Sequence, residues 1–212
     1  MNQRSLPLSQ NKVIPKLLSN AFLLGSIALA LSLVRCIGWV ASRDTKLTTD
    51  EEYIIYSVVV EATCAQDPNC FIALEDQTAS INSFVRNWDK TVALIKRKMP
   101  NLRQDTLNDF YSKNENPCAL KAAFKLKVEY VFISKKESEV IYKGGWREFY
   151  LRYPKARGLW KLSRVGFSRD MKQALVYVKR QSGYNSGQGV FYLLEKKGCE
   201  WIVASEYLYS VS

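Results

Sequence analysis

Glu75 and Asp76 are adjacent carboxylates, a residue type that could perform chemistry. A pair of acids can act as general acid and base, or can hold a hard cation through its oxygens. However, adjacent residues on a strand point to opposite faces of a sheet, so spacing alone does not pair them. The competing interpretation is a strand end followed by the start of a helix.

The chain has 212 residues and no histidine. This composition excludes Ser-His-Asp triads, Cys-His dyads, His-ligated zinc and histidine general bases. The only Ser-x-x-Lys spacing, from Ser9 to Lys12, lies in the N-terminal tail and not in a folded domain. We therefore expect no metal and no cofactor. The sequence favours a non-catalytic role without excluding an enzyme.

The cysteines could stabilise the fold by forming disulfides. Cys64 and Cys70 flank a five-residue turn that contains Pro68, so they either form a local disulfide or remain as thiols. Closing so short a loop would stabilise the fold by about 2 kcal/mol at most. Cys118 and Cys199 either pair at long range or stay as buried thiols. No Cys-x-x-Cys occurs, which argues against a thioredoxin-like redox centre.

Two further segments have the composition of ligand-binding sequences. Gly183, Gly187 and Gly189 could cradle an anion, but phosphate loops precede a helix, whereas a strand is expected here. A wide hairpin loop is therefore favoured. The stretch 146–161 interleaves bases with aromatic residues, as nucleic-acid-binding segments do. Its aromatic residues recur at helical spacing, which directs them into a core, and we do not expect nucleic acid as a partner.

An apolar segment near the N-terminus predicts attachment to a membrane. Residues 17–34 carry no charge, and a helix of this length nearly spans the hydrocarbon core. Lys12 and Lys16 precede it, which favours a cytoplasmic tail over 1–16, a transmembrane or signal segment over 17–42 and a linker over 43–49. We expect a single-pass anchor with the domain outside the cytoplasm. The alternative is a secreted or periplasmic protein after signal cleavage near Ser42.

Charge is distributed unevenly along a chain whose formal net charge is +11. Residues 47–84 hold seven acids and no base, whereas residues 142–180 hold eleven bases and two acids. The acidic part could dock on the basic part, or the basic part could face an anionic partner such as a lipid surface. Solvent-facing bases on strands need no partner at all.

Periodicity predicts the elements that must position these residues. Helices are expected over 53–62, 81–95, 104–111, 134–141 and 146–153, and strands over 71–74, 126–132, 159–167, 173–180, 189–196 and 201–209. Short turns between the last four strands predict an antiparallel meander. The fold class is therefore α+β, with residues 50–212 as one domain. Helices should cover one face of the sheet, and bases should occupy the other.

A set of motifs runs through the C-terminal half: Ser163-Arg164-Val165-Gly166-Phe167, Ala174-Leu175-Val176-Tyr177-Val178, Gly187, Gly189 and Tyr192-Leu193-Leu194-Glu195-Lys196. This pattern resembles a group of uncharacterised exported bacterial proteins, over residues from about 50 to the end. Members of that group often carry cysteines in the glycine-rich loop, where this chain has none between Ser182 and Gly189. That departure argues against a role that needs thiols there. At fold level the terminal meander resembles NTF2-like or cystatin-like domains.

The candidate ligand-binding residues are Glu75 and Asp76 and, from the shared pattern, Arg164, Tyr177 and Tyr192. The first functional hypothesis is a membrane-anchored extracytoplasmic module that binds an envelope protein or a small ligand without catalysis. The second is a carboxylate-based hydrolase that acts on an envelope polymer. The third is a basic domain that binds anionic lipid surfaces.

Overall fold

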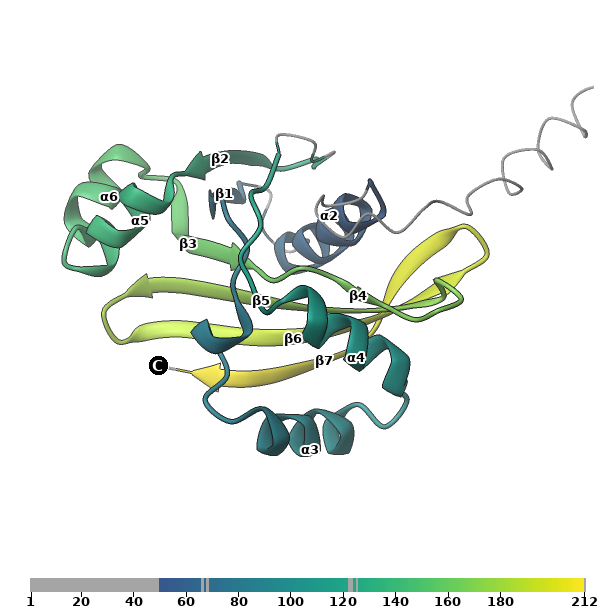
Figure 1. The fold of residues 1–212 in the computed structure, drawn as a ribbon. Coiled ribbons are helices and arrows are strands. Elements are labelled where there is room, and N and C mark those ends of the chain that lie inside the picture. The colour runs from purple at the N-terminus through teal and green to yellow at the C-terminus, as the bar shows by residue number, and fades with distance from the viewer. Residues whose placement is uncertain (1–49, 66, 68, 122–123, 125, 212) are drawn as a thin grey trace, which may run out of the picture. The chain divides into compact units, whose positions relative to one another are not determined.

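The computed structural model describes residues 50–65, 67, 69–121, 124 and 126–211 (Figure 1). The predicted tail over 1–16, membrane segment over 17–42 and linker over 43–49 lie outside these residues. Within the described ranges, no helix is both long enough and apolar enough to cross a membrane. The elements, in chain order, are α2 (Asp50–Cys64), β1 (Phe71–Glu75), η2 (Ile81–Ser83), α3 (Trp88–Lys98), α4 (Gln104–Lys113), β2 (Glu129–Ile133), α5 (Lys135–Tyr142), α6 (Trp146–Arg152), β3 (Ala156–Leu162), β4 (Gly166–Phe167), β5 (Gln173–Gly183), β6 (Ser186–Lys197) and β7 (Glu200–Val211).

All seven described strands belong to one sheet, in the order β2-β1-β3-β5-β6-β7, with β4 paired to β5. The predicted α+β class and the antiparallel meander from β3 to β7 are confirmed. However, β1 and β2 extend this sheet beyond the meander. Strand β1 pairs in parallel with both β2 and β3, so the sheet is mixed. The apolar run Phe71–Leu74 suits this inner position, because Ile72 and Leu74 pack with α2 and Phe71 and Ala73 pack with α5 and α6.

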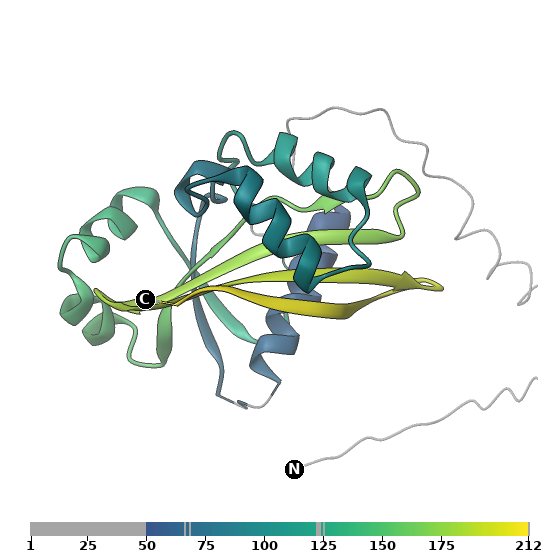
Figure 2. The same cartoon turned by 90° about the horizontal axis from the view of Figure 1, so that it is seen from below.

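Helices cover both faces of the sheet, so the expectation of one helical face and one basic face was wrong. Alternation along β5 explains the difference. Val176 and Val178 pack with α2 in one cluster, whereas Leu175 and Tyr177 pack with α3 and α4 in another. Figure 2 shows α3 and α4 on one side of the strands and α2 on the other. We call these sides the α2 face and the opposite face.

The predicted helix over 81–95 is shorter than its apolar spacing suggested. Only a 3₁₀ turn forms at Ile81–Ser83, and the α-helix begins at Trp88. Asn87 ends the extended segment and caps the helix, because its side chain accepts a hydrogen bond from the Lys90 backbone N–H at 2.9 Å. Ile81 and Val85 are still buried, but from a loop rather than from a helix.

The predicted strand over 159–167 is divided into β3 and β4 by an irregular segment, and several other local predictions differ at their ends or in their turns. Ser134 caps α5 by accepting from the Glu137 N–H, and β2 begins at Glu129 rather than at Leu126. The glycine-rich segment was expected to form a wide loop, which was wrong. Strands β5 and β6 continue to Gly183 and Ser186, which leaves a tight two-residue turn.

Candidate functional site

A row of residues crosses the opposite face of the sheet, from β1 to β7. Strand register places Lys161 opposite Lys179, Lys179 opposite Gly189, and Gly189 opposite Ser210. Glu75, at the end of β1, reaches this row through an ion pair with Lys161. We call Glu75, Lys161, Lys179, Gly189 and Ser210 the polar row.

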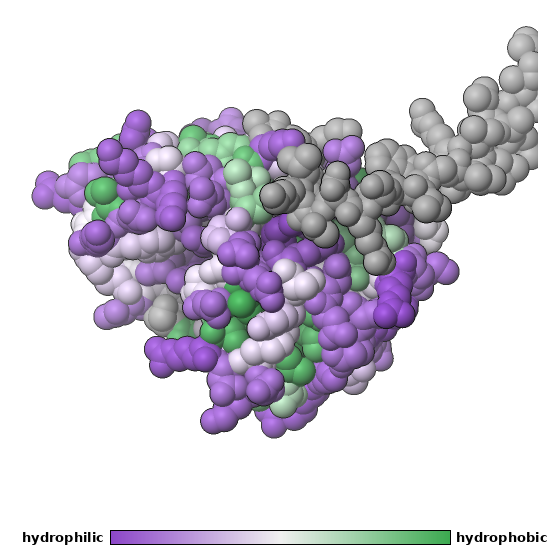
Figure 3. Space-filling model, in the orientation of Figure 1, coloured by the Kyte–Doolittle hydropathy of each residue, from purple (hydrophilic) through white to green (hydrophobic). Residues whose placement is uncertain are grey.

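The polar row separates two apolar clusters on the opposite face. One cluster joins α5 and α6 to Ala73 and Leu159. The other joins α3 and α4 to Tyr177 and Phe191. Figure 1 shows the two helix pairs at different ends of the sheet, and Figure 3 shows a mainly hydrophilic surface with only small apolar patches on this side of the molecule. The sheet is therefore polar where no helix pair covers it.

Glu75 is the buried anchor of the polar row, with only 1% of its surface exposed. One carboxylate oxygen accepts from the Tyr142 hydroxyl and the other from the Lys161 ammonium, each at 2.6 Å. Burial, with a further contribution from the Glu75 charge and hydrogen bond, raises the pKa of Tyr142 well above its ordinary value. Tyr142 therefore stays a neutral donor, and both oxygens of Glu75 are engaged.

Asp76 directly follows the last residue of β1 and does not share the hydrogen-bond partners of Glu75. Its side chain accepts from the Lys135 backbone N–H at 3.1 Å, at the start of α5. The two neighbouring carboxylates therefore do not form a joint acid–base or cation site. The prediction of a strand end followed by polar support for the next helical segment describes their contacts better.

Lys179 differs from Lys161 in its partners. Among the described residues, no carboxylate lies within 4.0 Å of the Lys179 ammonium, which instead lies 5.8 Å from the centre of the Tyr142 ring. Burial lowers the pKa of the Lys179 amine; Glu75 opposes that shift, and the Lys161 charge adds to it. The polar row thus holds two lysines against one carboxylate.

Tyr177 lies beside the row on β5 and is fixed from both sides. Phe84 stacks on its ring with 4.2 Å between centroids, and its hydroxyl lies 3.4 Å from the Ser210 hydroxyl. The tyrosine extends over Gly189, where an added Cβ would collide with the phenolic oxygen. Position 189 therefore needs glycine so that two hydroxyl groups can stand next to Lys179.

Arg164 and Tyr192, two other predicted site residues, lie outside the polar row. Arg164 occupies the irregular segment between β3 and β4, where its guanidinium pairs with Glu52 of α2 at 3.2 Å. Burial by itself would lower the pKa of Arg164, but Glu52 raises it above the ordinary value. Tyr192 belongs to the α2-face cluster, with its hydroxyl 3.3 Å from that of Thr63. Of the five predicted residues, only Glu75 and Tyr177 therefore contribute to this surface.

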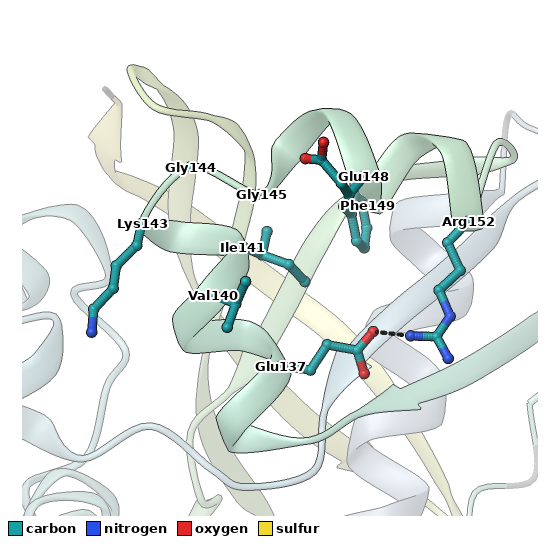
Figure 4. A pocket seen from close by; sticks show the side chains of 9 residues that line it. All are labelled: Glu137, Val140, Ile141, Lys143, Gly144, Gly145, Glu148, Phe149 and Arg152. Atoms are coloured by element: carbon teal, nitrogen blue, oxygen red, sulfur yellow. Dashed lines mark hydrogen bonds and ion pairs between the residues drawn. The ribbon is translucent and has the colours of Figure 1, made fainter.

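A separate hollow of about 650 Å³ lies between α5 and α6 (Figure 4). Glu137 and Arg152 form an ion pair beside it at 2.9 Å, and Lys143 and Glu148 point in different directions. None of the predicted site residues lines this hollow. Its charged groups do not converge on one point, so the polar row is the better candidate site.

Cys64 and Cys70 are joined by a disulfide with an S–S distance of 2.09 Å, which is one of the two predicted alternatives. The bridge ties the end of α2 to the segment before β1. No group of three or more Cys, Asp or Glu side chains gathers at a metal-binding distance in the part of the chain that the structure describes.

Sequence reasoning missed Lys161, Lys179 and Tyr142. Lys161 lies between the buried Trp160 and Leu162, and Lys179 directly follows the buried segment that ends at Val178. A charged residue at a position that alternation assigns to a covered face was the available signal. Tyr142 gave no such signal, because its contact with Glu75 joins residues 67 positions apart.

Comparisons with protein-family models, with curated proteins and with solved structures found no match to this chain. The resemblance to exported bacterial proteins and to NTF2-like or cystatin-like domains therefore stays a prediction.

Proposed function

We propose that residues 50–212 form a non-catalytic binding domain, held outside the cytoplasm by the apolar segment over 17–42, which binds its partner on the polar row. The observation that carries this proposal is the row itself. Charged residues interrupt a sheet face whose two flanks are apolar and covered by helices. Burying charge in such a place costs stability, so a binding role gives a reason for the exception.

The contacts of Glu75 support binding rather than hydrolysis. A general acid or base must reach its substrate, and Glu75 is 1% exposed, with one oxygen accepting from Tyr142 and the other from Lys161. Lys161 and Lys179 keep part of their surface in solvent, as a binding surface requires. The disulfide between Cys64 and Cys70 supports an extracytoplasmic location, because disulfides persist in oxidising compartments.

Lysine labelling tests the binding role. The full chain is treated with an amine-acylating reagent, once in the envelope of its source cells and once after purification in detergent. Mass spectrometry then compares each lysine between the two samples. We expect Lys179 to be protected in the envelope and labelled after purification, whereas Lys98 and Lys197, both exposed, react equally in the two samples. Equal labelling of Lys179 in both samples would show that the row is unoccupied and would overturn the proposal.

A C-terminal reporter that is active only outside the cytoplasm tests the location. The proposal expects an active reporter in the membrane fraction. An inactive reporter would place the domain in the cytoplasm and would remove export from the proposal, but it would leave the labelling result unaffected.

A further inference from the structure

We propose that the polar row recognises a phosphate group, held between the ammonium groups of Lys161 and Lys179; this inference rests on the proposed binding function. It begins with the register of β3 and β5, which places the two lysines directly opposite each other. Cβ atoms of such pairs lie about 5 Å apart, and like charges at that distance repel. Lys161 is paired with Glu75, whereas Lys179 has no carboxylate within 4.0 Å among the described residues.

The charge count of the row leaves room for one more anion. Glu75 is the only carboxylate that an ion pair joins to the row among the described residues, and its two oxygens already accept from Lys161 and Tyr142. No ion pair within 4.0 Å joins Glu75 to Lys179. An anion placed between the lysines would neutralise the excess charge and would restore the favoured charged form of Lys179.

The hydroxyls of Tyr177 and Ser210 meet at the same place; Tyr177 is buried and Ser210 is exposed, so the Ser210 hydroxyl is the donor open to a ligand. The two hydroxyls lie 3.4 Å apart, next to Gly189, which faces Lys179 across the β5–β6 pair. The Tyr177 hydroxyl fills the space over Gly189 and lies beside Ser210, so a ligand bound by Lys179 meets the Ser210 hydroxyl next to it. Point-charge ammonium groups and hydroxyl donors suit a tetrahedral phosphate, whereas planar carboxylates are better matched by the fork of an arginine.

Two sources of phosphate fit this chemistry: a small phosphomonoester or inorganic phosphate, and the headgroup of a lipid. Calorimetric titration of the purified full chain in a neutral detergent tests both. The probes are inorganic phosphate and soluble dibutanoyl phosphatidic acid, each measured against chloride at equal ionic strength. Binding of both probes supports a small phosphate ligand, and binding of the lipid alone supports a headgroup.

Matched variants test the residues. We expect Lys179→Met to weaken binding about tenfold or more, and Lys179→Arg to retain part of the affinity because it keeps the charge. Lys98→Met removes an exposed lysine of α3 and should bind as the unaltered chain does. Lys179→Met should fold, because it relieves repulsion and breaks no ion pair that the structure describes.

The phosphate inference would be overturned if neither probe binds. It would also be overturned if Lys179→Met and Lys98→Met lose the same amount of affinity. Failure here is distinguishable from failure of the proposed function. If Lys179 is protected in the envelope but phosphate does not bind, the row binds a partner of another chemistry. If Lys179 is not protected, the binding function itself is wrong.

Discussion

Charged side chains lie on both faces of the sheet, but in different settings. On the α2 face, Glu52 and Arg164 form a pair with 0% and 5% of their surfaces exposed, and Glu52 also accepts from the Val165 backbone N–H. On the opposite face, Lys161 pairs with Glu75, Lys179 has no carboxylate within 4.0 Å among the described residues, and both lysines stay partly open to solvent. The first arrangement matches each charge and fixes one packing, whereas the second leaves positive charge for a partner.

The largest expected loss of stability comes from a variant on the α2 face. Arg164→Met leaves Glu52 buried without its ion-pair partner, and breaking such a pair costs about 3–5 kcal/mol. Guanidinium unfolding of the full chain, followed by tryptophan fluorescence, measures the loss. The double variant Glu52→Gln with Arg164→Met should lose less than the single variant, because no buried charge remains. A loss of stability below about 1 kcal/mol in the single variant would show that the pair behaves as a solvent-exposed ion pair.

A smaller loss of stability is expected from the variant Tyr142→Phe on the opposite face. The phenylalanine keeps the ring but removes the donor to Glu75, and hydrogen bonds to charged groups contribute about 1.5–3 kcal/mol. Tyr184→Phe is the control, because Tyr184 is 64% exposed in the β5–β6 turn. If both variants unfold at the same denaturant concentration as the unaltered chain, Tyr142 does not support the row.

Reduction of the Cys64–Cys70 disulfide should cost about 2 kcal/mol or less, since the bridge closes a short loop. Unfolding is compared with and without dithiothreitol. The variant Cys64→Ala with Cys70→Ala should be insensitive to the reductant, because it lacks the bridge. A similar shift in that variant would assign the effect to another thiol.

The smallest expected effect is a gain in stability, in the variant Lys179→Met. Burial lowers the pKa of Lys179, so the unfolded chain binds more protons at any pH between that lowered pKa and the ordinary value of 10.5. Stability therefore rises with pH across this window as the folded amine loses its charge. Lys179→Met should lack that rise and should be more stable at pH 7 by less than about 1 kcal/mol. A less stable variant with an unchanged pH slope would contradict the unpaired state of Lys179.

Local sequence predicted most of the elements but only part of the surface. Helix α4 and the meander follow from periodicity and turn chemistry, which act over a few residues. The parallel pairing of β1 with β2 and β3 joins segments far apart in the chain, so no local pattern encodes it. The same reason explains why Glu75 was identified without Lys161 or Tyr142. Arg164 was chosen for its motif, yet the irregular segment between β3 and β4 directs it toward α2.

The most direct test of the contrast between the faces is a side-chain NMR titration of the full chain with inorganic phosphate. Residues that alternate along β5 provide the internal control, since Lys179 belongs to the polar row and Val176 and Val178 belong to the α2 face. Our account predicts saturating shifts of the Lys161 and Lys179 ¹³Cε signals, with the valine methyl signals unchanged. Equal shifts on both faces, or none at either lysine, would contradict the claim that the polar row is an anion-binding surface.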